Sequence, residues 1–493
     1  MTKRETLGAQ FSTAFELTER NKIKMFQYNK ITPEFIQQLQ TICGNENVFT
    51  DAEKTTPYAS DETERLVYMP EVVVKPNIPE QISEIVKLCN QHFIHLTPRG
   101  AGTGLSGGAL PIYGGVLLSM EKFNKILEID ERNLQATVEP GVINQVFQEA
   151  VSKIGLFYPP DPASKGSCML GGNVAESSGG PKCVKYGTTK DYILNLEVVL
   201  PTGEIIKTGA NTLKNSTGYN LTQLMVGSEG TLGIVTKIIV RLLPLPKHDL
   251  LMLVPFRSLD EACSAVSEVF RAGFIPSAME LMERDALEWV SKYVESSVVK
   301  IANDIQAHLL IEVDGNDVDV LMKDMEAIAE LVSKYEIDEI LFADSAAQKQ
   351  ELWKLRRKIN EAVTSNSISK EQDTVVPRAE LPKLVKGVKE IGKRYEFRSV
   401  CYGHAGDGNL HIRFIKDDMS DEKWHGDHIK KAIAELFTIC YELGGTISGE
   451  HGIGLIQQKF MPIVFSEKAM QLQRDIKKTF DPNMILNPGK MFY

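Results

Sequence analysis

A nonapeptide late in the chain sets two histidines on either side of a glycine-rich turn: Gly403-His404-Ala405-Gly406-Asp407-Gly408-Asn409-Leu410-His411. Side chains of a strand alternate between its faces, so His404 and His411, an odd number of positions apart, would point in opposite directions on one uninterrupted strand. The glycines at 406 and 408 disfavour a helix. The pattern therefore predicts a strand, a tight turn and a second strand, which together bring both imidazoles to one site.

Apolar residues alternate with His411 and Arg413 after this turn, so Arg413 is expected on the same face as His411. A second motif, Ser448-Gly449-Glu450-His451-Gly452, again places ligand-type side chains between glycines. One histidine in a glycine-rich turn is more often a surface or capping residue than a ligand. Two such motifs instead favour a divalent metal site, because such an ion takes neutral imidazoles and carboxylates as ligands. Asp407 and Asn409 are expected either to orient the imidazoles or to stabilise the turn.

The net charge and the cysteine pattern restrict the partners and the compartment. The formal charge of −10 and the lack of a basic patch argue against nucleic acid or an anionic membrane as a main partner. The 7 cysteines have no CxxC spacing, as expected for free thiols in a reducing compartment. No apolar signal segment is visible, and the longest uncharged run, 101–120, is rich in glycine. We therefore expect a cytoplasmic protein, and peripheral membrane contact stays open.

Several glycine clusters precede the histidine motifs. The first, Pro98-Arg99-Gly100-Ala101-Gly102-Thr103-Gly104-Leu105-Ser106-Gly107-Gly108, can bring consecutive backbone N–H groups to a phosphate. It lacks the Gly-Lys-Ser/Thr end of a P-loop, and a predicted strand at 115–120 follows it where a Rossmann dinucleotide site has a helix. Further clusters begin near 158, 171, 177 and 227, and each alone is more often a turn than a site. Together they favour one large cofactor lined by backbone.

A chain of 493 residues is too long for one compact core, so two or three domains are expected. We place an N-terminal segment at 1–50, a strand-rich domain at 51–246, an α+β domain at 247–445, and a C-terminal segment at 446–493 that packs back on the first domain. The main boundary follows Pro244 and Pro246. Strands are expected at 66–75, 94–97, 115–120, 196–200, 205–207, 250–254, 308–313, 373–376 and 397–402, and helices from Pro79, from Ser258 and at 318–332, 350–364 and 425–443.

The order of these motifs resembles that of the FAD-linked D-2-hydroxyacid dehydrogenases, which include D-lactate dehydrogenase, the glycolate oxidase catalytic subunit and D-2-hydroxyglutarate dehydrogenase. The segments that carry the resemblance are 98–105, 160–164, 171–173, 227–233, 403–411, 449–452 and 487–490. The resemblance implies an α+β chain with two domains. One is a FAD-binding domain of the vanillyl-alcohol-oxidase (PCMH) type, and the other is a substrate, or cap, domain with an antiparallel sheet.

The resemblance implies that the glycine clusters of the first domain hold FAD, with the loop at 99–106 on the pyrophosphate. Relatives that attach the flavin covalently place a histidine late in this loop, whereas this chain has Thr103, Gly104 and Leu105 there, so non-covalent FAD is expected. The residues expected to bind FAD are Arg99, Gly100, Ala101, Gly102, Thr103, Gly104, Ser106, Pro160, Asp161, Ser164, Gly171, Gly172, Asn173, Ser177, Gly179, Glu229, Gly230, Ile234 and Asn487.

The same resemblance implies that His404, His411 and Glu450 bind a metal, usually zinc, and that His451 is the catalytic base. Two histidines and one carboxylate also suit iron or manganese. By resemblance Arg356, in the segment Trp353-Lys354-Leu355-Arg356, would bind the substrate carboxylate, and Lys370 would correspond to a substrate-binding lysine. D-2-hydroxyglutarate dehydrogenases have a segment that resembles His-Leu-Asn at the position where this chain has His411-Ile412-Arg413. Arg413 is therefore a candidate for contacting the substrate side chain.

These roles describe one reaction. A metal with three protein ligands keeps positions open for the hydroxyl and carboxylate oxygens of a 2-hydroxy acid. His451 could take the hydroxyl proton while the α-hydride passes to flavin N5. The expected activity is FAD- and metal-dependent oxidation of a D-2-hydroxy acid, with D-lactate as first choice, and transfer of the electrons to an acceptor protein or a quinone. Alternatives are glycolate or D-2-hydroxyglutarate as substrate, a non-redox flavin-dependent alkyl transfer, and a metal-dependent hydrolase with structural glycine loops. A homodimer is compatible with all of them.

Overall fold

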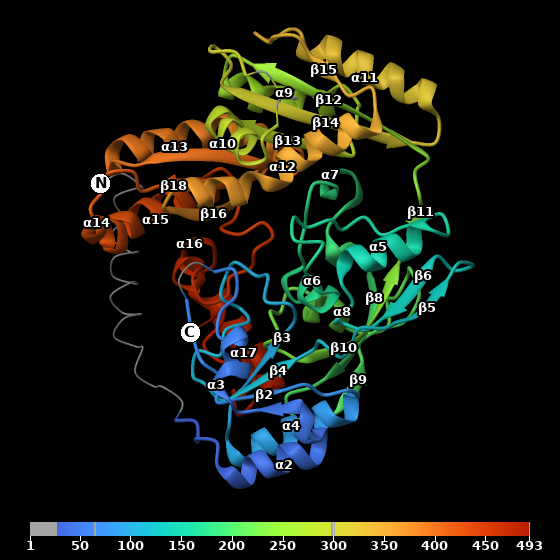
Figure 1. Cartoon of the computed structure of the whole chain (residues 1–493), viewed down its shortest axis with the longest axis vertical. Coiled ribbons are helices and arrows are strands. Elements are labelled where there is room, and N and C mark those ends of the chain that lie inside the picture. Colours follow the sequence, from blue (N-terminus) through green and yellow to red (C-terminus); the bar gives the residue numbers. More distant parts are fainter. Residues whose placement is uncertain (1–26, 64–65, 297–298, 300, 493) are drawn as a thin grey trace.

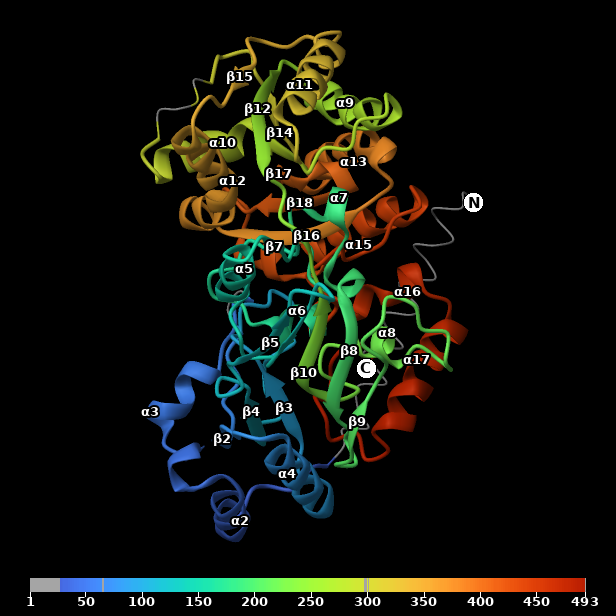
Figure 2. The same cartoon turned by 90° about the vertical axis from the view of Figure 1, so that its right-hand side faces the viewer.

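The computed structural model describes residues 27–63, 66–296, 299 and 301–492, which form two lobes stacked along the long axis of the molecule (Figure 1). One lobe contains the elements before β12 (His248–Phe256) and the end of the chain. The other contains the elements from β12 to α15 (Asp427–Glu442), and the two lobes meet near α7 (Cys183–Tyr186; Figures 1 and 2). Residues 1–26 of the expected N-terminal segment lie outside the described residues.

The first lobe contains two main sheets. One has the order β1-β2-β4-β3, in which β2, β4 and β3 are parallel, and the other has the antiparallel order β5-β6-β10-β8-β9. Helices α2 and α4 pack on the first sheet, and α5 and α6 on the second. The bounds are β1 (Val48–Phe49), β2 (Val72–Val74), β3 (Leu96–Arg99), β4 (Val116–Ser119), β5 (Ile126–Asp130), β6 (Gln135–Val138), β7 (Leu156–Phe157), β8 (Ile193–Val199), β9 (Ile205–Lys207), β10 (Ile234–Arg241), β11 (Leu243–Pro244), α2 (Pro33–Cys43), α3 (Ala52–Thr55), α4 (Pro79–His92), α5 (Asn144–Ser152), α6 (Leu170–Glu176) and α8 (Leu221–Met225).

The local predictions for this lobe are confirmed except in the extent of two strands, one of which, predicted at 94–97, is β3 at Leu96–Arg99. The helix predicted from Pro79 is α4; proline occupies its first turn, where a missing N–H costs nothing, and the apolar positions of the predicted helical face are buried. The predicted hairpin is the pair β8–β9, and the strand after the first glycine cluster is β4. The strand predicted over 66–75 is wrong in length, because only Val72–Val74 is paired. Pro70 has no N–H with which to extend the ladder.

The second lobe is built on a seven-stranded antiparallel sheet with the order β15-β12-β14-β13-β17-β18-β16. Helices α9, α11, α13 and α15 pack on one face, and α10 and α12 pack on the other. The helix predicted at 318–332 is α11, and the helix predicted from Ser258 is α9, whose first turn Ser258 caps. The bounds are β13 (Ala278–Glu283), β14 (Ala307–Gly315), β15 (Leu341–Phe342), β16 (Ser369–Val375), β17 (Arg398–His404), β18 (Asn409–Ile415), α9 (Leu259–Arg271), α10 (Arg284–Tyr293), α11 (Val318–Val332), α12 (Ala346–Asn366), α13 (Leu381–Tyr395) and α14 (Asp421–His425).

The end of the chain leaves the second lobe and returns to the first through α16 (Met461–Val464) and α17 (Glu467–Phe480), as Figure 2 shows. Leu96 N–H donates to the carbonyl of Ile485 at 2.8 Å, and Asn487 N–H donates to the carbonyl of Leu96 at 2.7 Å. The tail thus extends the sheet at β3. Within the described residues, no helix combines the length and apolar character needed to cross a membrane.

Buried and half-buried ion pairs connect the two lobes. Lys185 on α7 donates to the carboxylate of Asp314 on β14 at 2.6 Å, and the Tyr186 hydroxyl donates to the same oxygen at 2.8 Å. Arg357 on α12 donates to the carboxylate of Asp161 at 2.6 Å. Because solvent screens such pairs weakly, they fix how the lobes face each other.

Candidate active site

Four neighbouring strands of the second lobe carry the candidate residues on one face. In the register of the sheet, His411 of β18 pairs with Tyr402 of β17 on one side and with Asp373 of β16 on the other. Tyr402 packs in the core under α10 and α12, so residues at alternate positions from it share the face that these helices cover. The residues on this face are Glu280 of β13, His404 of β17, His411 and Arg413 of β18, and Glu371 and Asp373 of β16.

The tight turn predicted between the two histidines is confirmed. It is a 3-10 turn at Ala405–Asp407, followed by Gly408 at φ +84. A Cβ at position 408 would lie 1.9 Å from the carbonyl oxygen of Val376, so only glycine fits there. Asp407 accepts a hydrogen bond from the N–H of Asn409 at 3.2 Å. Of the two roles expected for Asp407, this contact supports stabilisation of the turn.

The structure brings His404, His411 and Glu450 together, with ligand atoms within 4.8 Å of one another. Nε2 of His404 lies 3.3 Å from Glu450 Oε1, and Nε2 of His411 lies 3.4 Å from the same oxygen. Ligand atoms at about 2.0–2.1 Å from a tetrahedral zinc are about 3.3–3.4 Å apart. The two nitrogen-to-oxygen separations therefore match those of a zinc ligand set.

Two carboxylates that the sequence analysis missed hold the imidazoles from behind. His404 Nδ1 donates to Glu280 at 2.9 Å, and His411 Nδ1 lies 3.1 Å from Glu371 Oε1. Glu280 holds the Nδ1 proton of His404, so Nε2 of that ring is the free ligand atom. At His411, Glu371 lies close to Nδ1 without a well-aligned hydrogen bond, and Nε2 of both rings faces Glu450. An acidic residue within a buried strand, as at Glu280, is the signal that could have found this partner.

The charge of the site also fits a divalent cation. The charged groups that gather here are the carboxylates of Glu280, Glu371, Asp373 and Glu450 and the guanidinium groups of Arg356 and Arg413, with the Asp407 carboxyl group close by. When both imidazoles are neutral, as metal ligands are, the carboxylates outnumber the guanidinium groups, and a divalent cation would neutralise the excess negative charge. Burial lowers the pKa of His404, but the Glu280 and Glu450 carboxylates more than offset this effect and raise that pKa well above its usual value.

Arg413 lies on the face of His411, as predicted, but protein groups engage its guanidinium. It pairs with Glu371, and its Nε lies 3.4 Å from the Tyr402 hydroxyl. The structure therefore favours a different role from substrate contact, in which Arg413 holds the carboxylate that lies against His411. Glu371, His411 and His451 are also close enough to hold an ion, but the positive charge of Arg413 opposes a cation there.

Asp373, another residue that the sequence analysis missed, fixes the loop that carries Glu450 and His451. Its Oδ2 accepts hydrogen bonds from the N–H groups of Gly449, Glu450 and His451 at 2.8, 2.9 and 2.9 Å. Its Oδ1 accepts one from the side chain of Asn409 at 2.7 Å. One buried carboxylate therefore ties the second histidine motif to the first.

Replacing Asp373 by alanine should release these three amide groups. A hydrogen bond to a charged group contributes about 1.5–3 kcal/mol, so we expect amide exchange at Gly449, Glu450 and His451 to accelerate roughly 10- to 100-fold. Hydrogen exchange followed by mass spectrometry measures this effect, with the exposed Asp418→Ala as matched control. Unchanged exchange in Asp373→Ala would show that other contacts hold the loop.

Arg356 and Lys370 have different surroundings. Arg356 Nε donates to Glu280 at 2.6 Å, and its Nη2 is buried without a hydrogen-bond partner among the described residues. This nitrogen can take a carboxylate oxygen close to His404. Lys370 precedes Glu371 on β16 and so points to the opposite face, where its Nζ lies 5.4 Å from the Trp424 ring centroid. The structure does not bring Lys370 to the metal ligands, although it borders the cavity described next.

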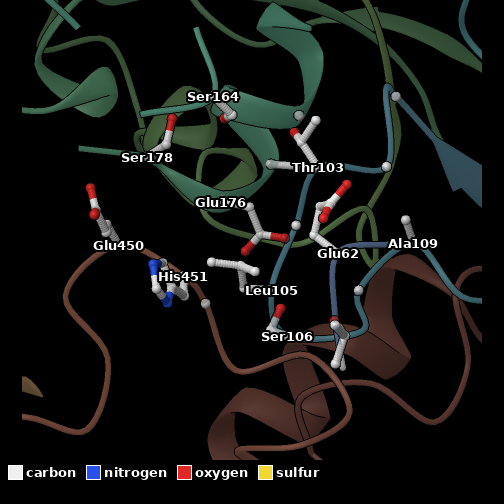
Figure 3. Close-up of a pocket in the computed structure, with 18 of the residues that line it drawn as sticks. Glu62, Thr103, Leu105, Ser106, Ala109, Ser164, Glu176, Ser178, Glu450 and His451 are labelled. Carbon is white, nitrogen blue, oxygen red and sulfur yellow. The ribbon is translucent and has the colours of Figure 1, made fainter. Parts of the chain in front are cut away.

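A cavity of about 1160 Å³ runs from the glycine clusters of the first lobe to Glu450 and His451 (Figure 3). Arg99 Nη1, Ser106 Oγ and Glu176 Oε2 are buried without hydrogen-bond partners among the described residues, and all three side chains line the cavity. Such orphaned groups indicate a polar ligand, and the cavity is large enough for FAD. The candidate cofactor residues in its wall are Arg99, Gly100, Ala101, Gly102, Thr103, Gly104, Ser106, Ser164, Gly171, Gly172, Asn173, Glu229, Gly230 and Ile234.

The remaining candidate cofactor residues are not part of this wall: Pro160, Asp161, Ser177, Gly179 and Asn487. A Cβ at Gly179 would lie 2.8 Å from Glu450 Oε2, so Gly179 lies beside the proposed metal ligand. The Asp161 carboxylate is occupied by Arg357 and Lys165. The Asn487 side chain donates to the carbonyls of Gly108 and Glu229 at 3.0 and 2.8 Å. Asn487 thus supports the wall from outside, and the signals that pointed to these five residues were glycine and turn clusters.

The cavity and the histidine centre together define a two-lobed protein with a dinucleotide-sized cofactor site next to a candidate metal centre. Two family models match the chain, the FAD binding domain over residues 70–209 and the C-terminal domain of FAD linked oxidases over residues 245–491. The chain therefore belongs to the FAD-linked oxidase family, as the order of its motifs predicted.

Curated relatives match over nearly the whole chain. The glycolate oxidase subunit GlcD of Bacillus subtilis is 38% identical over 94% of this chain and 97% of its own length. A D-lactate dehydrogenase of Anaerostipes hadrus is 38% identical over 95% of this chain and 99% of its own length. The protein is thus an FAD-linked enzyme of the oxidoreductase class.

Solved structures confirm the predicted fold. p-Cresol methylhydroxylase superposes with a TM-score of 0.76 at 19% identity, covering 94% of this chain and 98% of that chain. Alkyldihydroxyacetonephosphate synthase superposes with a TM-score of 0.70 at 20% identity, covering 94% of this chain and 86% of that chain. At these identities the likeness shows the fold alone, which is the two-domain α+β fold of the vanillyl-alcohol-oxidase (PCMH) type.

Proposed function

We propose that this protein is an FAD- and divalent-metal-dependent dehydrogenase that oxidises a D-2-hydroxy acid, with D-lactate as first choice, to the 2-oxo acid. The observation that carries the proposal is the His404–His411–Glu450 ligand set, which lies next to His451 where the FAD-sized cavity ends. The names of two relatives, a D-lactate dehydrogenase and a glycolate oxidase subunit, support this substrate class.

In this proposal the metal supplies Lewis acidity and FAD supplies the hydride acceptor. His404, His411 and Glu450 hold the cation, which is zinc in the simplest case. Arg356, whose Nη2 has no partner among the described residues, binds the substrate carboxylate. His451 takes the proton of the substrate hydroxyl.

The glycine loop at 99–106 holds FAD without a covalent bond in this proposal, because Thr103, Gly104 and Leu105 offer no histidine. The match to a FAD binding domain favours this function over a metal-dependent hydrolase. The electrons leave to an acceptor protein or a quinone. The free cysteines are consistent with a cytoplasmic location.

A panel of substrates tests the proposal. Under anaerobic conditions we expect D-lactate to bleach the flavin absorbance, and L-lactate to leave it unchanged. The rates at which glycolate and D-2-hydroxyglutarate bleach the flavin in the same panel show which 2-hydroxy acid is the preferred substrate. Flavin that no hydroxy acid reduces, together with turnover of an acyl-dihydroxyacetone phosphate, would replace this proposal by alkyl transfer, the function named for one solved structure of this fold.

A further inference from the structure

Glu176 is a half-buried acid that the proposed chemistry leaves unused. It ends α6, and its carboxyl group projects into the cavity near Leu105 and His451 (Figure 3). Its Oε2 is buried without a hydrogen-bond partner among the described residues. A Cβ at Gly452 would lie 2.0 Å from this oxygen, so the residue that follows His451 makes room for the carboxyl group by having no side chain.

A second carboxyl group shares this space. Glu229 Oε1 lies 3.0 Å from the Cβ position at Gly452, and the two oxygens of Glu229 accept hydrogen bonds from the N–H groups of Ile453 and Gly454 at 2.7 and 2.6 Å. Glu229 is buried and Glu176 is half-buried. Two carboxylates this close do not readily ionise together, because their charges repel in a poorly solvated site. Two N–H donors stabilise the negative charge on Glu229, so Glu229 is the group expected to ionise and Glu176 the one expected to stay neutral.

The surrounding charges favour the same assignment. Burial raises the pKa of Glu176 well above its usual value, the Glu229 charge raises it further, and so does Asp61. Lys490 acts in the opposite direction, but its Nζ is turned to the carbonyl of Leu110 at 2.6 Å. The two carboxyl groups and their hydrogen-bond donors thus favour the neutral form of Glu176 at the cavity.

A protonated carboxyl group has an O–H that needs an acceptor, and on the open side of Glu176 lies the cofactor cavity. We propose that Glu176 donates a hydrogen bond from its neutral carboxyl group to the isoalloxazine ring of bound FAD and so raises the reduction potential of the flavin. The ring gains electron density when it is reduced, so a donor stabilises the reduced form more than the oxidised form. The inference rests on the proposed function only in placing the ring beside His451.

Dye-coupled reductive titration of the FAD-loaded protein tests this inference without any hydroxy acid. Glu176→Met keeps the volume but has no donor, and we expect it to weaken the preference for reduced flavin about tenfold, which lowers the midpoint potential by about 30 mV. Glu176→Gln keeps a neutral donor and should stay close to the parent potential. Glu361→Gln, at an exposed site on the outer edge of the cavity, is the matched control.

Three results would overturn the inference. A higher potential in both Glu176 variants would mean that the native group is ionised. Equal potentials in all four proteins would mean that it does not contact the flavin. Loss of FAD from both variants would make Glu176 a structural residue. Failure of the proposed function is distinguishable, since it would leave the flavin unreduced by every hydroxy acid while Glu176→Met still shifts the potential.

Discussion

His451→Gln should keep its FAD and reduce it with D-lactate about 10²- to 10⁴-fold more slowly than the parent, because a general base contributes about that factor. The His451 ring stacks on that of His411, with centroids 5.1 Å apart, where the cavity meets the metal ligands. Glutamine has a similar reach but cannot take a proton at neutral pH. Anaerobic stopped-flow absorbance of the flavin measures the rate.

The matched control for this variant is His425→Gln, an exposed histidine in the same lobe, which should reduce its flavin at the parent rate. The main-chain N–H of His451 bonds to Asp373 and is unaffected by the replacement, so the loop should keep its position. Loss of FAD from His451→Gln would assign His451 to cofactor binding. An unchanged rate would remove it from the chemistry altogether.

The second large effect is expected at Glu450, whose Oε1 lies between the two imidazoles. Glu450→Gln keeps the volume and removes the negative charge, so the metal loses a ligand and the site loses part of its negative potential. Metal affinity should fall by more than the roughly 10- to 100-fold that loss of an outer hydrogen-bond partner costs. Metal per chain, measured by elemental analysis after dialysis against a chelator, reports the change.

Asp407→Asn is the matched control for Glu450→Gln. Asp407 belongs to the same histidine motif, but its observed contact is with the N–H of Asn409, so its replacement should leave the metal content unchanged. Full metal occupancy in Glu450→Gln would contradict the ligand set. Equal metal loss in both variants would indicate a general effect of the negative charge near the turn.

Local patterns were sufficient for much of the fold and for the prediction of a metal site at the two histidine motifs. The helix after Pro79, the boundaries of α11 and the turn at Gly408 are each determined by residues close together in the sequence, so they could be predicted from it. The choice of His404, His411 and Glu450 as the ligands was implied by the family resemblance, and it stays a prediction. The family resemblance then gave the motifs their order and joined them to the FAD loops.

The residues that the sequence analysis missed depend on strand register. Glu280, Glu371 and Asp373 reach the imidazoles and the Glu450 loop only because β13, β17, β18 and β16 lie side by side. The sequences of β13 and β16 do not indicate which strands lie beside them in the sheet. The same reason explains Arg413, whose face was predicted correctly but whose partner, Glu371, comes from the adjacent strand.

The central claim is that one metal and one flavin act on the same D-2-hydroxy acid. Its most direct test is anaerobic flavin absorbance after addition of D-lactate to the protein as purified, after chelation, and after zinc is restored. We expect bleaching, then no bleaching with the flavin still bound, then bleaching again. Undiminished bleaching after complete removal of the metal would contradict the claim.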